Sequence, residues 1–331
     1  MVLHELLSFP PLIQFMELAA ILTLIEWLLL VSGRKFSLGA PITERSLHKV
    51  FTPTGGGIIW IIAAVLGFLL FANLTVFQSW VFIVGIIALG IISFIDDVHP
   101  LPPIPRLISQ IIVVSLSFIQ LCQPTAFDIF LLVIFCGVGI INAINFLDGI
   151  CGMLALYGLV VTSSFLYAIY TLAIPELLWL MPVLEMVIIA QIVFACFNLK
   201  DVIFAGDVGS ITLGYIQIFA AISLVLITGD GSYLIFFGVC IFDTGLTTLQ
   251  RLFSGISILI PHRMNIYQLL TTEKGIPHVV VSIIYALLQL LINALFFLIP
   301  HSQHWTYFLL VSALLTITYF GVRFSFRKPI N

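Results

Sequence analysis

Long apolar runs separated by short polar segments fill the sequence, and their spacing predicts a chain that crosses a membrane many times. A membrane-spanning helix needs about 20 predominantly apolar residues. Backbone groups in lipid must be satisfied internally, which favours helices. We therefore predict an all-α polytopic bundle of about eleven membrane-spanning helices. The predicted spans are residues 9–31, 55–73, 78–95, 107–122, 127–144, 153–173, 177–197, 209–228, 232–250, 277–299 and 305–322.

Composition agrees with a membrane protein of one domain. Hydrophobic residues make up 61% of the 331 residues and charged residues 8%, whereas a soluble domain has about 25% charged residues. No Pro/Ser-rich or like-charged linker divides the chain, and we find no internal repeat such as an inverted-repeat transporter shows. We predict a single integral-membrane domain over residues 1–331. No Lys or Arg precedes the first span, so we expect no cleaved signal peptide.

The 12 Lys and Arg residues predict the orientation of the bundle. With the spans above, all of them fall in alternate loops or in the C-terminal segment, and such loops face the cytoplasm. We therefore expect the N-terminus outside the cell and the C-terminus inside it. The basic face suits membrane lipids and substrates that are anionic. Nucleic acid is not an expected partner, because no basic stripe interleaved with aromatic residues is present.

The most informative polar segment, residues 91–106, has the sequence IISFIDDVHPLPPIPR and separates two predicted spans. Asp96 and Asp97 are adjacent in it, and charged side chains are tolerated at the water boundary but rarely deeper. The prolines that follow prevent the helix from continuing. Arg106 can pair with a phosphate or with the two acids. We predict an acidic site at a membrane surface; a solvated acidic loop is the alternative.

Two further cytoplasmic loops carry residues suited to phosphates. The first contains HKVFTPTGGG, whose glycines let the backbone approach a ligand and whose Lys49 and Thr52 can donate hydrogen bonds to phosphate oxygens. The third contains NAINFLDGICG, in which Asn145 and Asp148 would share one face of a helix that ends at the membrane. An ordinary helix terminus is the alternative for the third loop.

The last two cytoplasmic loops add a carboxylate and cations. The fourth contains FAGDVGSITLG, in which Asp207 is expected to be either the N-cap of the next helix or a Mg²⁺ ligand. The fifth contains PHRMNIYQ, where His262 and Arg263 can hold a phosphate; a solvated basic patch is the alternative. Together the loops suit the joining of an anionic soluble substrate to an anionic lipid, since Mg²⁺ and basic side chains offset their repulsion.

Acids and cysteines also occur inside the predicted spans. Glu17 and Glu26 are nine residues apart and point in nearly opposite directions on a helix, so they form no paired site. Asp243 can face the cytoplasmic side if its helix bends. Such acids, which also include Glu185, either have a function or satisfy hydrogen bonds between helices. The cysteines show no ligand or disulfide spacing and are interpreted as packing residues: Cys122, Cys136, Cys151, Cys196 and Cys240.

The motifs in this order resemble the polyprenyl-phosphate N-acetylhexosamine-1-phosphate transferase superfamily, glycosyltransferase family 4, to which the phospho-N-acetylmuramoyl-pentapeptide transferases belong. The resemblance covers residues 49–268, and its last motif is most similar to the branch that initiates bacterial O-antigen and capsule. It implies ten or eleven helices around a cytoplasmic cleft, location in the bacterial cytoplasmic (inner) membrane, and a homodimer. The motifs that carry it are TPTGGG, IDDVHPLP, NAINFLDG, FAGDVGSITLG, FDTGLTTLQR and PHRMNIYQ.

The resemblance also implies the reaction. An N-acetylhexosamine-1-phosphate, GlcNAc or a deoxy derivative such as FucNAc or QuiNAc, passes from a UDP-sugar to undecaprenyl phosphate, with release of UMP, and starts a cell-surface glycan. Mg²⁺ is the implied cofactor, with Mn²⁺ as the alternative ion. The implied catalytic residues are Asp96, Asp97, Asp148 and Asp207, of which Asp207 and Asp97 are the metal ligands. The implied substrate-binding residues are Lys49, Thr52, Asn145, Asp243, His262 and Arg263.

Two departures from the family pattern keep other functions open. Cys151 stands where many relatives have Asp, and Asn265 where relatives commonly have His. One alternative is a catalytically inactive relative acting as a scaffold, against which the retained aspartates argue. The other is a proton-coupled transporter that uses the acids inside the spans. Such acids are expected at mid-membrane, whereas the polar motifs here lie at helix ends.

Overall fold

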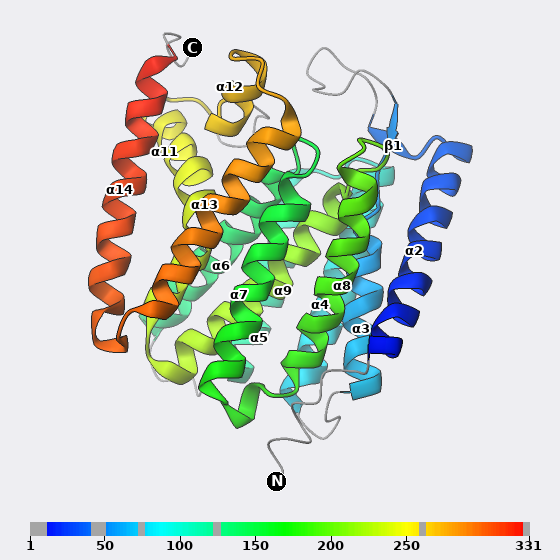
Figure 1. Ribbon diagram of the computed structural model, residues 1–331, viewed down its shortest axis with the longest axis horizontal. Coiled ribbons are helices and arrows are strands. Elements are labelled where there is room, and N and C mark those ends of the chain that lie inside the picture. The colour runs from blue at the N-terminus through cyan, green and yellow to red at the C-terminus, as the bar shows by residue number, and fades with distance from the viewer. Residues whose placement is uncertain (1–11, 41–50, 72–76, 122–126, 258–262, 327–331) are drawn as a thin grey trace.

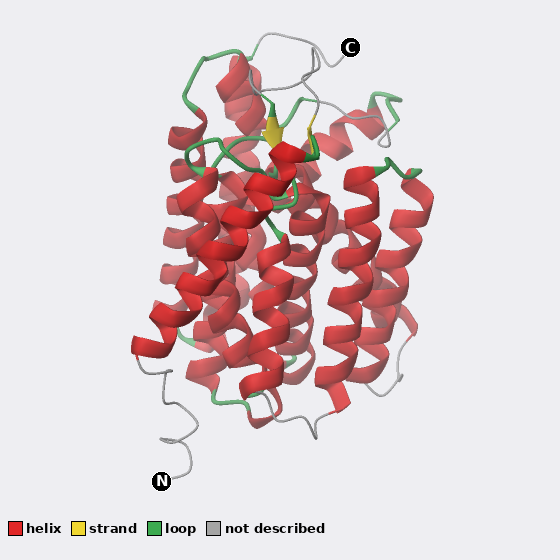
Figure 2. Cartoon of the chain, turned by 90° about the vertical axis from the view of Figure 1, so that its right-hand side faces the viewer, coloured by secondary structure: helices red, strands yellow, loops and turns green. Residues whose placement is uncertain are grey.

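The structure, a computed structural model, describes residues 12–40, 51–71, 77–121, 127–257 and 263–326. Its long helices run side by side in one bundle, as Figures 1 and 2 show. Among the described residues, ten helical segments are long and apolar enough to cross a membrane, and a shorter apolar helix covers Ile58–Leu70. The predicted class is therefore confirmed, and each of the eleven predicted spans corresponds to one of these segments.

The bundle is built from long helices joined by short elements. The long helices are α2 (Leu12–Lys35), α3 (Ile58–Phe71), α4 (Phe77–Val98), α5 (Pro103–Leu121), α6 (Phe127–Leu147), α7 (Met153–Leu172), α8 (Leu180–Asn198), α9 (Gly206–Thr228), α13 (His278–Leu298) and α14 (His304–Ser325). The short elements are β1 (Gly39–Ala40), β2 (Thr52–Pro53), η1 (Pro175–Leu177), η2 (Gly231–Phe237), α10 (Gly238–Cys240), η3 (Ile241–Gly245), α11 (Leu246–Phe253), α12 (Ile266–Thr272) and η4 (His301–Gln303). The two strands pair antiparallel, with Gly39 opposite Pro53.

Helix α9 forms the centre of the bundle. Nearly all of its side chains from Gly206 to Leu224 are buried, and it contacts α4 and α6 on the way. Helices α2 and α14 lie at opposite edges (Figure 1) and expose apolar side chains such as Trp27 and Leu310. An apolar exterior is expected of a bundle surrounded by lipid tails. Other helices therefore pack around α9 along most of its length. A polar cluster lies at each of its two ends, as described below.

Glycines allow α3 and α9 to approach each other closely. A Cβ atom added to Gly209 would lie 2.7 Å from the Cα atom of Gly57. Small residues at a crossing let two backbones come together, which is a common way to pack helices in membranes. Gly57 ends the glycine-rich first loop, and Gly209 lies in the first turn of α9. The contact therefore holds the first loop against the start of α9.

Several boundaries differ from those predicted. Helix α4 continues to Val98, so Asp96 and Asp97 lie in its last turn and not in a loop. Helix α5 begins at Pro103, a position where proline suits a helix because the first N–H needs no partner there. The ninth predicted span is not one regular helix: it consists of η2, α10, the π-helix η3 and α11. Asp243 lies in the π-helix, so the helix is irregular at this acid.

Candidate active site

Asp97 connects the end of α4 to the start of α9. Its Oδ1 atom accepts a hydrogen bond from the backbone N–H of Asp207 at 2.9 Å, and its Oδ2 atom accepts one from the N–H of Val208 at 2.9 Å. The first N–H groups of a helix have no partner within the helix and favour negative charge. Ala205, the residue at the N-cap position, provides no side-chain bond. Asp97 therefore caps α9 from another helix, and the expectation that Asp207 is the N-cap is wrong.

Gly206 fits the position between these carboxylates because it has no side chain. Its N–H donates to Oδ2 of Asp148, in the turn after α6, at 3.1 Å. Its φ of 74° lies in the left-handed region that glycine adopts freely. A Cβ atom there would lie 2.6 Å from Oδ2 of Asp97. The glycine before Asp207 thus lets two carboxylates from different helices reach the start of α9.

Arg106 joins two of the predicted catalytic carboxylates. Its Nη1 atom lies 2.6 Å from Oδ2 of Asp96, and its Nη2 atom lies 2.8 Å from Oδ2 of Asp207. The other oxygen of Asp96 accepts a hydrogen bond from the N–H of Leu101, which fixes the proline-rich turn after α4. Of the two acids predicted as partners of Arg106, Asp96 is one, and the second carboxylate is that of Asp207 in place of Asp97; pairing with a phosphate stays a prediction.

Asn145 completes the surroundings of Asp207. Its Nδ2 atom donates to Oδ1 of Asp207 at 2.9 Å and lies 2.8 Å from the Oγ atom of Ser210. Asn145 is in the last turn of α6, and Ser210 is one turn after Asp207 in α9. Asp96, Asp97, Asn145, Asp148 and Asp207, predicted from three separate motifs, therefore meet in one place. This place, defined by these five residues and Arg106, is called the acidic site below.

The charges of the acidic site are unbalanced among the residues that the structure describes. The site contains four carboxyl groups, and Arg106 forms ion pairs with two of them, those of Asp96 and Asp207. Burial raises the pKa of Asp148 well above its usual range, and the nearby Asp207 and Asp97 carboxyl groups raise it further. Like charges held this close favour a cation between them. The site is thus suited to bind a positive group in addition to Arg106.

The donor atoms fit a divalent ion of the Mg²⁺ type. Such an ion takes oxygen ligands and commonly uses one or two carboxylates together with substrate phosphates. Within the described ranges, the acidic site has no set of three carboxylate oxygens that all lie within 4.8 Å of one another. Asp97 differs from Asp207 because both of its oxygens already accept backbone N–H groups.

The glycine-rich first loop lies against the segment before α9. The N–H groups of Gly56 and Gly57 donate to the carbonyls of Phe204 and Ala205 at 3.0 and 3.1 Å, and the N–H of Phe204 donates to the carbonyl of Pro53 at 2.8 Å. Thr52 is buried in β2, next to this contact. The first loop is therefore brought to the acidic site as predicted. Lys49 lies outside the described residues.

Asp243 organises the fifth loop. Its Oδ1 atom accepts from the N–H of Ile266, and its Oδ2 atom accepts from the N–H of Tyr267 and from the hydroxyl of Tyr285. Because Ile266 and Tyr267 begin α12, Asp243 caps this helix in the way Asp97 caps α9. The hydroxyl of Tyr267 donates to the carbonyl of Phe146 at the end of α6. The predicted role of Asp243 in substrate binding stays a prediction; its observed contacts position the loop.

Arg263 precedes this helix and is half-buried. The carbonyl of the next residue, Met264, accepts a hydrogen bond from Nη1 of Arg323 in α14 at 2.9 Å. Tyr267 joins the loop that contains Arg263 to the end of α6. His262 lies outside the described residues. The predicted binding role of Arg263 is therefore compatible with its place but is not tested by it.

Cys151 and Asn265, the two residues that depart from the family pattern, are both buried in the structure. Cys151 is buried in the turn between α6 and α7, and burial raises the pKa of its thiol to about 11. A thiol of this kind is neutral at physiological pH and does not replace an anionic ligand. Asn265 is buried immediately before α12, and its N–H donates to Oε1 of Gln268. Cys136, Cys151, Cys196 and Cys240 are free, as expected, and Cys122 lies outside the described residues.

Three side chains near the site were not predicted: Ser210, Tyr267 and Tyr285. Ser210 follows Asp207 by three residues, a spacing that places both on one helix face, so the sequence held a signal for it. Tyr267 belongs to the PHRMNIYQ motif, but its hydrogen bond to α6 depends on contact between distant segments. Tyr285 lies in an apolar stretch of α13 and has no local signal.

Comparison with known proteins adds a family and several relatives. Residues 79–225 match the profile of the family described as Glycosyl transferase family 4. The matched segment covers most of α4, all of α5 to α8 and most of α9. It therefore contains all six residues of the acidic site, and it ends before the fifth loop.

The relatives with named functions carry two kinds of description. Phospho-N-acetylmuramoyl-pentapeptide-transferase of Lactobacillus johnsonii is 31% identical over 195 residues, 50% of this chain and 60% of the relative. The protein of that name from Streptococcus thermophilus is 32% identical over 214 residues, 55% of this chain and 61% of the relative. A probable undecaprenyl-phosphate N-acetylglucosaminyl 1-phosphate transferase of Bacillus subtilis is 28% identical over 244 residues, 68% of this chain and 67% of the relative. The chain thus spans about 60% of the length of the first relative.

Proposed function

We propose that the chain is a member of glycosyl transferase family 4, whose profile residues 79–225 match, and that it transfers a sugar-1-phosphate from a UDP-sugar to undecaprenyl phosphate. The observation that carries the proposal is the acidic site. Aspartates from the ends of α4 and α6 and from the start of α9 meet at one end of a membrane-spanning bundle. A site there is accessible to a lipid phosphate and to a soluble nucleotide at once.

The reaction we propose is a single displacement. An oxygen of the lipid phosphate attacks the β-phosphorus of the UDP-sugar, the bond from this phosphorus to the bridging oxygen breaks, and UMP leaves with that oxygen. The products are UMP and a polyprenyl-diphospho-N-acetylhexosamine. The second pKa of a phosphate monoester is about 6, so the attacking oxygen is largely anionic near neutral pH. A covalent enzyme intermediate is therefore not needed.

The side chains of the acidic site have separate parts in this reaction. Asp96 or Asp97 accepts a remaining proton of the lipid phosphate; the oxygens of Asp97 accept the backbone N–H groups that begin α9, and those of Asp96 bond to the N–H of Leu101 and to Arg106. Arg106 can exchange one of its carboxylate partners for a phosphate, which it can hold in bidentate fashion. Asn145 orients Asp207 by a hydrogen bond. A bound Mg²⁺, held by Asp207 with Asp97 beside it, would neutralise phosphate charge.

The donor sugar and the location are the finer parts of the proposal. We propose an N-acetylated hexosamine, in keeping with the B. subtilis relative's name, and the start of a bacterial cell-surface glycan as the use of the product. We also propose that the acidic site faces the cytoplasm. The basic residues of the described helix ends support this, because Arg34, Lys35, Arg106, Arg251 and Arg323 belong to the ends of α2, α5, α11 and α14 on the site's side (Figure 1).

A proton-coupled transporter gains no support from the intramembrane acids. Glu17 is exposed on α2, Glu26 is buried on the same helix, and Glu185 is half-buried on α8. Within the described residues, no hydrogen bond or ion pair joins any of these glutamates to another or to Asp243. A proton relay needs acids that are linked to one another or to a water-filled path.

The deciding experiment identifies the released nucleotide. Purified protein is incubated with undecaprenyl phosphate, Mg²⁺ and a panel of UDP-N-acetylhexosamines, and UMP with a diphosphate-linked lipid is expected. Asp207→Asn should abolish this turnover, whereas the matched control Asp128→Asn should not, because Asp128 is exposed in the first turn of α6 at the opposite end of the bundle. Release of UDP would mean glycosyl transfer and would refute the mechanism. Unchanged turnover in Asp207→Asn would remove this residue from the site.

A further inference from the structure

A second polar cluster lies at the end of α9 opposite to the acidic site. Asp230 follows Gly229, the C-cap of α9; His301 begins η4, in the connection from α13 to α14, and His304 is the first residue of α14. The 23 residues of α9 separate the two clusters by about 34 Å at 1.5 Å per residue. The cluster therefore belongs to the other surface of the bundle and takes no part in the reaction proposed above.

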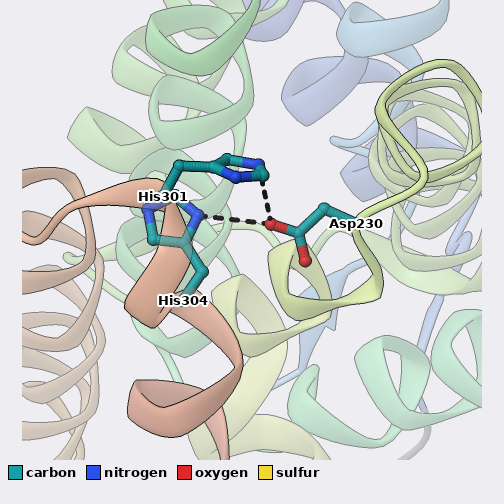
Figure 3. Close-up of side chains that lie close together, drawn as sticks. All are labelled: Asp230, His301 and His304. Atoms are coloured by element: carbon teal, nitrogen blue, oxygen red, sulfur yellow. Dashed lines mark hydrogen bonds and ion pairs between the residues drawn. The ribbon is translucent and has the colours of Figure 1, made fainter.

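The three side chains point toward one another, as Figure 3 shows. Oδ2 of Asp230 lies 3.2 Å from Nε2 of His301 and 3.3 Å from Nδ1 of His304. All three ligand atoms lie within 4.8 Å of one another. Within the described part of the chain, this is the one set of three His, Cys, Asp or Glu side chains with that property. Two imidazoles and one carboxylate are a common ligand set for Zn²⁺ and related transition-metal ions.

The same contacts, which are ion pairs and a hydrogen bond in the absence of an ion, have lengths that also fit a metal site. Charge-assisted N–H···O bonds are about 2.7–2.9 Å long, which is shorter than both observed separations. In a tetrahedral site with metal–ligand bonds of about 2.0–2.1 Å, neighbouring ligand atoms are about 3.3–3.4 Å apart. The Asp230 oxygen is at this spacing from both imidazoles. A rotation of His301, whose side chain is 64% exposed, can bring the two nitrogens to the same spacing.

The surroundings hold two of the three ligands in place. The second oxygen of Asp230 accepts a hydrogen bond from the N–H of Ser232 at 2.9 Å, so Oδ2 is directed to the histidines. The ring of His304 is buried against Phe296, with ring centroids 4.0 Å apart. Supporting contacts that orient the ligands are typical of metal sites. The exposed His301 leaves a path by which an ion can enter and a position that water can fill.

We propose that Asp230, His301 and His304 bind a transition-metal ion of the Zn²⁺ class and that the ion fastens α14 to the corner between α9 and η2. Helix α14 lies at the edge of the bundle (Figure 1), and few of its side chains are buried: His304, Leu315 and Tyr319. A metal bond between its first residue and Asp230 would therefore stabilise its attachment. At the other end of α14, Nη1 of Arg323 donates a hydrogen bond to the carbonyl of Met264, the residue that follows Arg263.

The test uses the full chain in detergent, purified without a polyhistidine tag and stripped with a chelator. Metal content after Zn²⁺ addition and dialysis, and the visible spectrum after Co²⁺ addition, report occupancy and tetrahedral geometry. One ion per chain is expected, with affinity at least about 100-fold weaker in His301→Ala. The matched control Gln303→Ala, in the same exposed turn, should bind as the wild type does. His301 is exposed, so its replacement leaves the fold intact.

Thermal unfolding tests the fastening. Saturating Zn²⁺ should raise the unfolding temperature of the wild type and of Gln303→Ala by about 3–5 °C, and should leave that of His301→Ala unchanged. Equal affinity of His301→Ala and the wild type, or binding only at millimolar Zn²⁺, would overturn the metal site. Tight binding without a change in unfolding temperature would overturn the fastening of α14. Asp230→Asn, which retains an acceptor for Ser232, should behave as His301→Ala does.

Discussion

Replacement of Asp97 tests whether this residue positions the start of α9. Ala at this position removes both acceptors of the N–H groups of Asp207 and Val208, whereas Asn retains one acceptor oxygen. Replacement of Asp207 by Asn keeps a side chain that can bond to Asn145 and removes no acceptor of a backbone group. The two aspartates therefore should differ in stability although both are expected to be needed for turnover.

The magnitude follows from the two hydrogen bonds. A hydrogen bond to a charged group contributes about 1.5–3 kcal/mol when buried. Asp97 is only part-buried, so water replaces part of each lost bond, and about 1 kcal/mol per bond is a suitable figure. Asp97→Ala should therefore cost about 2 kcal/mol and Asp97→Asn about 1 kcal/mol. With an unfolding entropy of about 2.1 cal/mol/K per residue, 331 residues give a loss of about 3 °C for Asp97→Ala.

The assay is thermal unfolding in one detergent, followed by UMP release under saturating substrates. The expected order of unfolding temperature is wild type, then Asp97→Asn, then Asp97→Ala, with Asp207→Asn close to the wild type because its ion pair with Arg106 is partly exposed. Asp128→Ala serves as the control for loss of an acid. An unfolding temperature of Asp97→Ala within 1 °C of the wild type would show that the two hydrogen bonds do not hold α9. If Asp97→Asn needs a higher Mg²⁺ concentration for turnover but its turnover still responds to Mg²⁺, Asp97 positions the site and is not itself required as a metal ligand.

Three further predictions address other parts of the structure. Gly206→Ala should lower the stability by about 2 kcal/mol, because an L residue in the left-handed region costs about 1–2 kcal/mol and its Cβ would meet Asp97. The control is Gly321→Ala, where a Cβ has nothing within 4 Å. Equal unfolding temperatures of the two variants would contradict the argument. Tyr285→Phe removes one of three donors to buried Asp243. It should cost about 1–2 kcal/mol of stability and raise KM for the UDP-sugar more than it lowers kcat. The control Tyr307→Phe, which removes a hydroxyl that donates to a carbonyl far from Asp243, should leave KM unchanged. A fluorescent protein fused after residue 331 should fluoresce inside the cell, and an alkaline phosphatase at the same place should be inactive; the reverse would place the acidic site outside the cytoplasm.

The membrane spans were predictable because they depend on local composition. Each apolar run in the sequence corresponds to a helical segment, although α3 has only 14 residues. The ninth span was predicted as one helix and is divided into four elements, because Asp243 must reach the N–H groups that begin α12. A π-helix of this kind often occurs at a functional position. Its cause is a partner 23 residues away in the chain, which no local pattern shows.

The residues of the acidic site were predictable from the sequence, but the hydrogen bonds between them were not. Counting alternate loops placed the motifs of Asp97, Asp148 and Asp207 at one membrane surface, and the structure brings them together there. One of the two roles expected for Asp207 was the N-cap of its own helix, since Asp is common at this position; the other was a Mg²⁺ ligand. The cap instead comes from α4, 110 residues earlier. The far cluster was missed altogether, because 71 residues separate Asp230 from His301 and only the spacing of His301 and His304 is local.

The occupied start of α9 also constrains how phosphates bind. A free helix N-terminus is a common phosphate site, but here the N–H groups of Gly206, Asp207 and Val208 already donate to Asp148 and Asp97. We therefore expect phosphates at the acidic site to be held by cations, which would be a bound metal ion and side chains such as Arg106. Removal of Mg²⁺ should then abolish binding of the UDP-sugar and not only its turnover. Calorimetry of UDP binding with and without a chelator measures this, and equal affinity in both conditions would show that the protein's own donors suffice.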